Sequence, residues 1–185
     1  MELLKEMKNW PVTSVDGHIF LLNPISDGIP PCNPALVSEA LHLLSNLSDF
    51  NCDAILGIEP GGVVLAAAIS IDRGRSYTIA RRKSYGLPKE ICVPVQRPLF
   101  AGPLYVNLSK ETRRVVIVDD FLASGRTLHE VASSVGGIGV SVVDILVLFE
   151  RDDVRREFQS IGDLRPKSVA KINVNEHGAK VVNGS

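Results

Sequence analysis

The sequence predicts an α/β fold, in which a twisted and mainly parallel sheet carries helices on both faces. Short apolar segments that suit buried strands alternate along the chain with segments whose apolar residues recur at helical spacing. The strand segments are apolar on both faces, as expected of parallel strands that helices cover on each side. With 185 residues the chain has the size of one domain, and we expect residues 1–185 to form it.

Each element of this fold rests on a local pattern. Helices are expected where apolar residues recur every three or four positions, strands where apolar residues follow one another, and turns where proline and glycine cluster. Asn33 before Pro34 marks the best-defined helix start, since Asn caps a helix and Pro suits its first position. In chain order, we expect a helix at 1–9, a strand at 18–22, a proline-rich turn at 24–34, a helix at 34–47, a strand at 53–58, a turn at 59–62, a helix at 63–71, strands at 76–81 and 113–119, a helix at 127–135, a strand at 140–149, a helix at 152–160 and a strand at 168–174.

Residues 83–104 predict a long surface loop instead of a regular element. The segment contains prolines, glycines and several charges, and loops of this length without structure of their own are usually functional. We expect this segment to be mobile and to close over a bound substrate.

The composition limits the classes of partner and compartment. A net charge of −1 and a pI near 6.4 leave no basic surplus for nucleic acid or for a membrane surface. Cys32, Cys52 and Cys92 are far apart and odd in number, so we expect neither a disulfide framework nor a zinc site. The sequence shows no signal-peptide core and no apolar run of about 18 residues. We therefore expect a cytoplasmic protein that binds neither nucleic acid nor membrane.

The stretch VVIVDDFLASGRT, residues 115–127, joins an apolar strand to two acids and a loop of small residues. In parallel sheets, ligands bind beyond the carboxyl ends of the strands, where helix N-termini present unpaired amides. Small residues and the hydroxyls of Ser124 and Thr127 suit a phosphate. Asp119 and Asp120 would repel that phosphate, so we expect them to accept hydrogen bonds from sugar hydroxyls or to help hold Mg²⁺. The stretch therefore indicates a site for a phosphorylated sugar.

Two other interpretations of this stretch were considered. An Asp-rich turn followed by an ordinary helix cap would need no ligand at all. A nucleotide P-loop is disfavoured because the pattern G-x-x-x-x-G-K-[ST] is missing.

The same thirteen residues resemble the phosphoribosyl pyrophosphate (PRPP) signature of type I phosphoribosyltransferases. The segments NPISDGIP, ILGIEPGGVVLAAAIS, ARRKSYGLPKE, VQRPLFAGPLYVN and VVDILVLFE are similar, in order and spacing, to archaeal hypoxanthine or adenine phosphoribosyltransferases. The resemblance covers roughly residues 20–150. It implies the type I phosphoribosyltransferase fold, with a flexible catalytic loop and a small hood over the base to which residues 1–32 contribute.

The resemblance also implies a role for each motif. Asp119 and Asp120 are the expected catalytic pair, which binds the ribose hydroxyls and holds Mg²⁺ directly or through ribose or water. The other expected contacts are the 5′-phosphate at Ala123, Ser124, Gly125, Arg126 and Thr127, pyrophosphate at Glu59, Pro60, Gly61, Gly62, Arg82 and Lys83 with Arg81 in reserve, and the base at Ile25, Ser26 and Phe149.

The residue types alone leave simpler interpretations open for several of these positions. Residues 59–62 would also suit an ordinary glycine turn, and residues 81–83 a solvated run of charge. Phe149 at a strand end would also suit the core, and residues 25–27 a proline-rich turn.

The expected function is that of a purine phosphoribosyltransferase, a glycosyltransferase of purine salvage. It would join a purine base to PRPP and release a nucleoside 5′-monophosphate and pyrophosphate. Hypoxanthine or guanine is favoured, with adenine a close second. Mg²⁺ is the expected cofactor. A homodimer is expected because pyrophosphate sites of the family borrow residues from a neighbouring subunit.

Two alternatives to this function stay open. A non-catalytic PRPP-binding regulator is favoured by Phe100 and Ala101, which depart from the family pattern, and disfavoured by the lack of a DNA-binding segment. An orotate enzyme is the weaker alternative. The sequence identifies neither an acid or base within residues 84–105 nor the role of the tail after Ser168.

Overall fold

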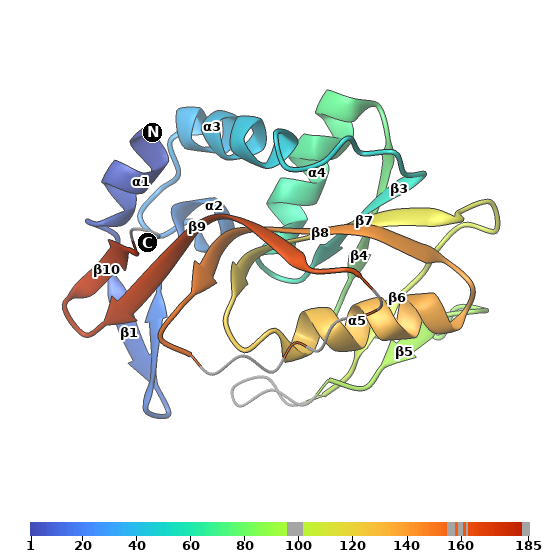
Figure 1. Cartoon of the computed structure of the whole chain (residues 1–185). Coiled ribbons are helices and arrows are strands. Elements are labelled where there is room, and N and C mark those ends of the chain that lie inside the picture. The colour runs from blue at the N-terminus through green and yellow to red at the C-terminus, as the bar shows by residue number, and fades with distance from the viewer. Residues whose placement is uncertain (96–101, 155–157, 159–160, 162, 183–185) are drawn as a thin grey trace.

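A six-stranded sheet forms the centre of the computed structural model, which describes residues 1–95, 102–154, 158, 161 and 163–182 (Figure 1). The strand order is β10-β9-β8-β7-β3-β4, and every neighbouring pair is parallel except β10 with β9. The predicted α/β class is therefore confirmed. The strands are β3 (Ala54–Ile58), β4 (Ser76–Ala80), β7 (Arg114–Leu122), β8 (Ser141–Arg151), β9 (Pro166–Asn175) and β10 (Gly178–Val181).

Helices cover both faces of this sheet. The helices α1 (Glu2–Met7), α3 (Pro34–Ser45) and α4 (Gly62–Arg73) lie on one side, and α5 (Arg126–Gly137) lies on the other (Figure 1). Successive residues of one strand supply two separate cores, because side chains along a strand point to alternate faces. Val116 and Val118 pack with the first group of helices, whereas Val115 and Ile117 pack with α5.

The start of α3 agrees with the sequence, whereas the acidic pair lies further inside its strand than expected. The side chain of Asn33 accepts a hydrogen bond from the backbone N–H of Ala35 at 3.0 Å, so the predicted cap of α3 is confirmed. The strand β7 was expected to end at Asp119 but runs on to Leu122. It continues because Phe121 and Leu122 still pair with β8.

The N-terminal region contains two elements that the sequence analysis missed. A strand β1 (Val12–Val15) pairs with β2 (His18–Leu21) around Asp16 and Gly17, which both adopt positive φ. An Asp-Gly pair is a typical hairpin turn and was the available signal. The proline-rich segment then begins with a one-turn helix, α2 (Pro24–Asp27), instead of an irregular turn.

The expected loop at residues 83–104 is partly regular. The strands β5 (Ile91–Val93) and β6 (Leu104–Val106) form an antiparallel hairpin, because Val93 and Leu104 are buried against the core on the α5 side. Gln96, Arg97, Phe100 and Ala101 lie outside the described residues.

The prediction of a helix at 152–160 is wrong for residues 152–154. Residues 152–154 form a bend, in which the Arg151 guanidinium binds Asp153 and the N–H of Asp152 still pairs with Ile172 of β9. Most of residues 155–160 lie outside the described residues.

The N-terminal region and the tail both lie beside the carboxyl ends of the strands (Figure 1). The tail extends the sheet as β10, which answers the question that the sequence left open. Nearby, the guanidinium of Arg151 donates to the backbone oxygen of Ile19 at 2.8 Å, which ties β2 to the end of β8. Residues 1–32, which we call the hood segment, therefore lie beside the edge where the loops leave the sheet (Figure 1).

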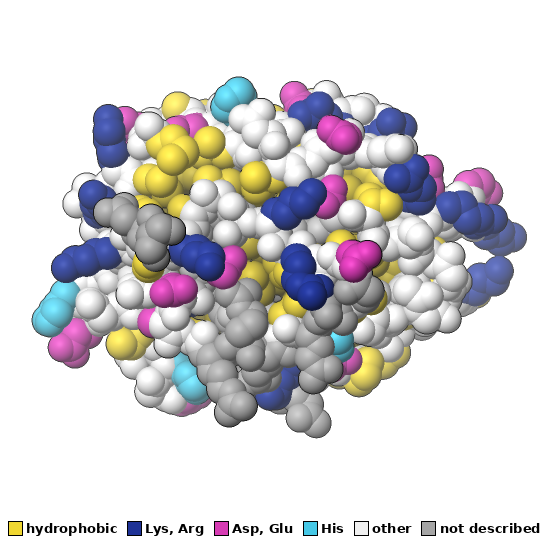
Figure 2. All heavy atoms as spheres, viewed as in Figure 1, with side chains coloured by type: hydrophobic (Ala, Val, Ile, Leu, Met, Phe, Trp, Pro, Cys, Tyr) yellow, Lys and Arg dark blue, Asp and Glu magenta, His cyan; other side chains and the backbone are white. Residues whose placement is uncertain are grey.

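The surface is mixed in charge. On the face drawn in Figure 2, Lys and Arg side chains lie interspersed with Asp and Glu. Within the described part of the chain, none of the helices is both apolar enough and long enough to cross a bilayer.

Candidate active site

Three loops meet at the carboxyl edge of the sheet because the strands that precede them are parallel neighbours. Residues 59–61 join β3 to α4, residues 123–125 join β7 to α5, and residues 81–83 follow β4. Parallel strands all end at one edge, where ligands of open α/β sheets bind. The structure thus brings together the motifs assigned to the ribose, the 5′-phosphate and the pyrophosphate.

The loop before α4 touches the acidic pair directly. A Cβ atom on Gly61 would lie 1.9 Å from Oδ1 of Asp120, and one on Gly62 would lie 2.2 Å from the backbone oxygen of Val118. Backbone and carboxylate oxygens cannot yield that much space. Only glycine therefore fits at both positions, and the loop at 59–62 is more closely constrained than an ordinary glycine turn.

Asp120 is held by neutral donors. Its Oδ2 accepts hydrogen bonds from Oγ of Ser26 at 2.5 Å and from Nδ2 of Asn23 at 3.2 Å. Burial raises the pKa of Asp120 above its ordinary value, although the bonds from Ser26 and Asn23 act in the opposite direction. Asp119 accepts from the backbone N–H of Asp120 through Oδ1 at 3.0 Å.

The loop after β7 ends at the start of α5 with Gly125, whose φ of 84° suits glycine. Amides in the first turn of a helix have no partner within the helix, and helix N-termini are therefore common anion sites. Ser124 places its Oγ 3.4 Å from the N–H of Arg126.

Phe158 packs onto the same loop. Its N–H donates to the backbone oxygen of Ser124 at 3.0 Å, and its Cβ would lie 2.7 Å from a Cβ on Gly125. Phe158 was not predicted near this loop, because it follows β8 and carries no local signal of the contact.

Arg82 lies beside the loop before α4. Oε2 of Glu59 accepts a hydrogen bond from the N–H of Arg82 at 2.7 Å, and Oε1 lies 4.0 Å from Nε of Arg82. Glu59 was expected to bind pyrophosphate, an anion that its carboxylate would repel. In the structure its carboxylate accepts from the backbone N–H of Arg82, while Arg82 and Lys83 are exposed at the edge.

The guanidinium of Arg81, the reserve choice for pyrophosphate, makes several contacts within the protein. It pairs with Glu90, donates to Oδ1 of Asn107 at 2.6 Å, and lies 4.8 Å from the ring centre of Tyr85. Through these contacts it fastens the β5–β6 hairpin to the end of β4. Arg82 and Lys83, which are exposed, are thus better placed than Arg81 to reach a ligand.

The three residues expected to contact a base are differently placed. Phe149 is completely buried, with its ring 5.8 Å from that of Trp10 and 5.4 Å from that of Phe121. Ile25 is buried in the same core, and the Ser26 hydroxyl is used on Asp120. These placements favour packing and positioning over direct contact with a base. Phe121 is the partly exposed aromatic residue next to the acids.

The donors fit Mg²⁺ when it arrives with a substrate. Asp119 and Asp120 supply hard carboxylate oxygens, but no group of three or more His, Cys, Asp or Glu is gathered for a metal among the described residues. Mg²⁺ is commonly bound through one or two carboxylates together with substrate phosphates. The site therefore suits a metal shared with a phosphorylated ligand and not a cage made by protein alone.

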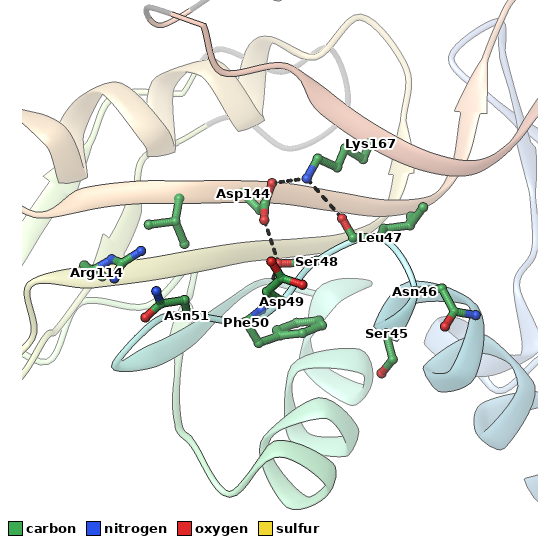
Figure 3. A pocket seen from close by; sticks show the side chains of 11 residues that line it. Ser45, Asn46, Leu47, Ser48, Asp49, Phe50, Asn51, Arg114, Asp144 and Lys167 are labelled. Atoms are coloured by element: carbon green, nitrogen blue, oxygen red, sulfur yellow. Dashed lines mark hydrogen bonds and ion pairs between the residues drawn. The ribbon is translucent and has the colours of Figure 1, made fainter.

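A polar pocket of about 570 Å³ lies at the opposite edge of the sheet, where the strands begin (Figure 3). Asp144 lies at its centre, 2.5 Å from Nζ of Lys167 and 2.6 Å from Oγ of Ser48. None of the predicted site residues lines it. The pocket therefore forms no part of the candidate active site.

Comparisons with known proteins agree with this arrangement. Residues 33–179 match the model of the phosphoribosyl transferase domain. The chain is 33% identical to a hypoxanthine/guanine phosphoribosyltransferase of Methanohalophilus mahii, over 98% of this chain and 96% of that protein. A protein of the same name from Ferroglobus placidus is 30% identical over the same shares of the two chains.

Solved structures share the fold. The adenine phosphoribosyltransferase of Rhodothermus marinus matches with a TM-score of 0.71 and 19% identity, covering 92% of this chain and 98% of that one. The adenine enzyme of Trypanosoma brucei, solved with AMP, pyrophosphate and ribose-5-phosphate, has a TM-score of 0.73 at 15% identity and covers 92% and 80%. The type I phosphoribosyltransferase fold is confirmed by these neighbours.

Proposed function

Because the chain belongs to the phosphoribosyl transferase family, we propose that it transfers the phosphoribosyl group of PRPP to a purine base and releases pyrophosphate. The observation that carries the proposal is the close approach of Gly61 to Asp120. It places the loop expected to bind pyrophosphate directly beside the acid expected to bind ribose. In this arrangement the two ends of one PRPP molecule would lie on the N-termini of α4 and α5.

Different residues would act on the pyrophosphate, the ribose and the 5′-phosphate of PRPP. As the bond from C1 of the ribose to pyrophosphate breaks, negative charge grows on the leaving group, where the amides at the start of α4 and the Arg82 cation stabilise it. Asp119 and Asp120 hold the ribose hydroxyls, and the loop at 123–127 holds the 5′-phosphate. Mg²⁺, bound between these acids and the substrate, would supply further positive charge at the pyrophosphate.

We assign the base to the region beside Phe121. Phe121 is partly exposed, its ring lies against the buried ring of Phe149, and an aromatic ring beside the acids is a suitable stacking partner for a planar base. The relatives named hypoxanthine/guanine phosphoribosyltransferase are 30% to 33% identical over nearly the whole chain. We therefore favour hypoxanthine or guanine, and place adenine second.

The test is a set of parallel reactions with PRPP, Mg²⁺ and one base each: hypoxanthine, guanine, adenine, xanthine or orotate. Nucleotide formed with hypoxanthine or guanine is the expected result. PRPP binding without any product would favour the second candidate, a regulator that binds PRPP and does not turn it over. A lack of PRPP binding would refute both.

We further propose a cytoplasmic homodimer. Large apolar side chains are exposed on α4 and along the outer strand β4 with the segment after it, which suits a partner subunit. These residues are Val64, Ile71, Tyr77, Tyr85 and Leu87. Three free cysteines suit a reducing compartment.

Light scattering should give twice the chain mass of 20.0 kDa, and Ile71→Asp, at a position 85% exposed, should shift the protein toward the monomer. A monomeric wild-type protein would contradict the dimer.

A further inference from the structure

A hydrogen-bond network joins the hood segment to Asp120, from which it is separated by more than 90 residues of chain. Oδ2 of Asp120 accepts from Ser26 and from Asn23, and Nδ2 of Asn23 also donates to Oγ of Ser26 at 3.1 Å. The other carboxylate oxygen lies against Gly61. The carboxylate is thus fixed on one side by α2 and on the other by the loop before α4.

The direction of each bond in this network is determined. Oδ1 of Asn23 caps α2 by accepting from the N–H of Ile25 at 3.0 Å, so the amide must present its Nδ2 to Asp120. Turning the amide over would place two acceptors against each other. Ser26 already accepts from Asn23, and its own proton therefore goes to Asp120.

Asn23 is completely buried, and the network is therefore part of the packed fold and not a surface contact. Its backbone N–H donates to Oδ2 of Asp27 at 2.8 Å, which closes α2 on itself. The side chains of Ser26 and of the cap residue Asn23 both donate to one carboxylate oxygen, so Asp120 is the acceptor that satisfies them in the fold. A carboxylate has about four lone-pair sites, so capacity remains for a ligand.

We propose that Asn23 and Ser26 are positioning residues, which act on PRPP through Asp120 and so couple the position of the hood to ribose binding. The proposal rests on the proposed function, because it requires Asp120 to contact the ribose. Base and PRPP would then influence each other's affinity through one shared carboxylate.

A double-mutant cycle tests whether Ser26 acts through Asp120. PRPP binding with Mg²⁺ is measured by calorimetry for the wild type, Ser26→Ala, Asp120→Asn and the double variant. With Asp120 unchanged, Ser26→Ala should weaken PRPP binding about tenfold, because it removes the hydrogen bond from Ser26 to the Asp120 carboxylate. In the Asp120→Asn background it should change binding less than about twofold. Equal effects in both backgrounds would overturn the proposal.

Asn23→Asp sharpens the test, because Asp caps a helix as well as Asn does but cannot donate to Asp120. It should lower the melting temperature, because a second carboxylate would face Oδ2 of Asp120 in a buried place, and it should weaken PRPP binding at least as much as Ser26→Ala. Ser38→Ala, on the exposed face of α3, is the matched control and should bind PRPP normally.

The outcomes separate the two proposals. Failure of the wild type to bind PRPP would refute the proposed function itself. Normal PRPP binding by the wild type, Ser26→Ala and Asn23→Asp together would refute only the coupling.

Discussion

Acidic residues at the two edges of the same sheet are satisfied in different ways. At the carboxyl edge, Asp120 accepts hydrogen bonds from an amide and a hydroxyl, both of them neutral. At the amino edge, Asp144 is paired with the Lys167 ammonium. Neutral donors fix a carboxylate without cancelling its charge, whereas an ammonium ion cancels it.

Asp120 therefore keeps a charge that a ligand can use, whereas the charge of Asp144 is neutralised within the fold. A carboxylate that keeps its charge in a partly buried place raises the free energy of the folded protein until a cation or a hydroxyl group arrives. The carboxylate of Asp144 does not raise the free energy in this way, because the Lys167 ammonium neutralises it. The same substitution at the two edges should therefore have opposite consequences.

Asp120→Asn should have the largest effect. We expect kcat/KM for PRPP to fall about 100-fold or more, because the charge next to the reacting sugar is lost. The melting temperature should stay level or rise, since a partly buried charge has been removed. Steady-state kinetics and thermal denaturation of the same preparation test both statements, and a variant with full activity would end the ribose assignment.

Glu59→Ala should come next. Without its carboxylate, the N–H of Arg82 loses the acceptor that places it beside the loop before α4. We expect KM for PRPP to rise about tenfold, with a smaller change in kcat. Lys110→Ala, on the exposed turn before β7, is the control that should leave KM unchanged.

Asp144→Asn repeats the first substitution at the amino edge. We expect the free energy of unfolding to fall by about 1 kcal/mol, because the ion pair with the half-exposed Lys167 is lost. Activity should not change. Urea denaturation measures the free energy of unfolding, and a rate assay on the same protein measures activity. A loss of activity would contradict the prediction and would mean that the pocket in Figure 3 affects the active site.

Asp53→Asn should have the smallest effect and should depend on pH. Hydrogen bonds from the backbone N–H groups of Arg113 and Arg114 hold the pKa of Asp53 below its ordinary value. Such a group stabilises the fold above its unfolded pKa of about 3.9, and the benefit is lost as the pH falls through the folded pKa. The wild type should therefore melt higher than the variant at pH 7, with a difference that disappears in acid. A constant difference at every pH would contradict this account.

Periodicity and caps sufficed to predict the main architecture. The buried strands, the start of α3 and the loops at 59–62 and 123–127 follow from residues that are adjacent in the sequence, and for these the local signal agrees with the tertiary structure. The Asp-Gly turn between β1 and β2 was equally readable and was missed.

The contacts of the site residues could not be predicted in the same way. Whether Phe149 faces a ligand or the core depends on Trp10, which lies far away in the sequence. Ser26 meets Asp120, and Arg81 meets Glu90 and Asn107, only after the chain has folded. Pair contacts of this kind leave no periodic pattern, so a single sequence indicates which residues are polar but not which partner each one takes.

The aromatic stack gives the protein a built-in optical reporter. Trp10 is the only tryptophan of the chain, and it lies edge-on to Phe149, which in turn rests on Phe121 beside the acids. All indole emission therefore originates from one position, where the N-terminal region packs on strand β8. A shift of α2 or of Phe121 on substrate entry will alter the colour and intensity of that emission, so that rapid mixing can time the movement without any attached dye.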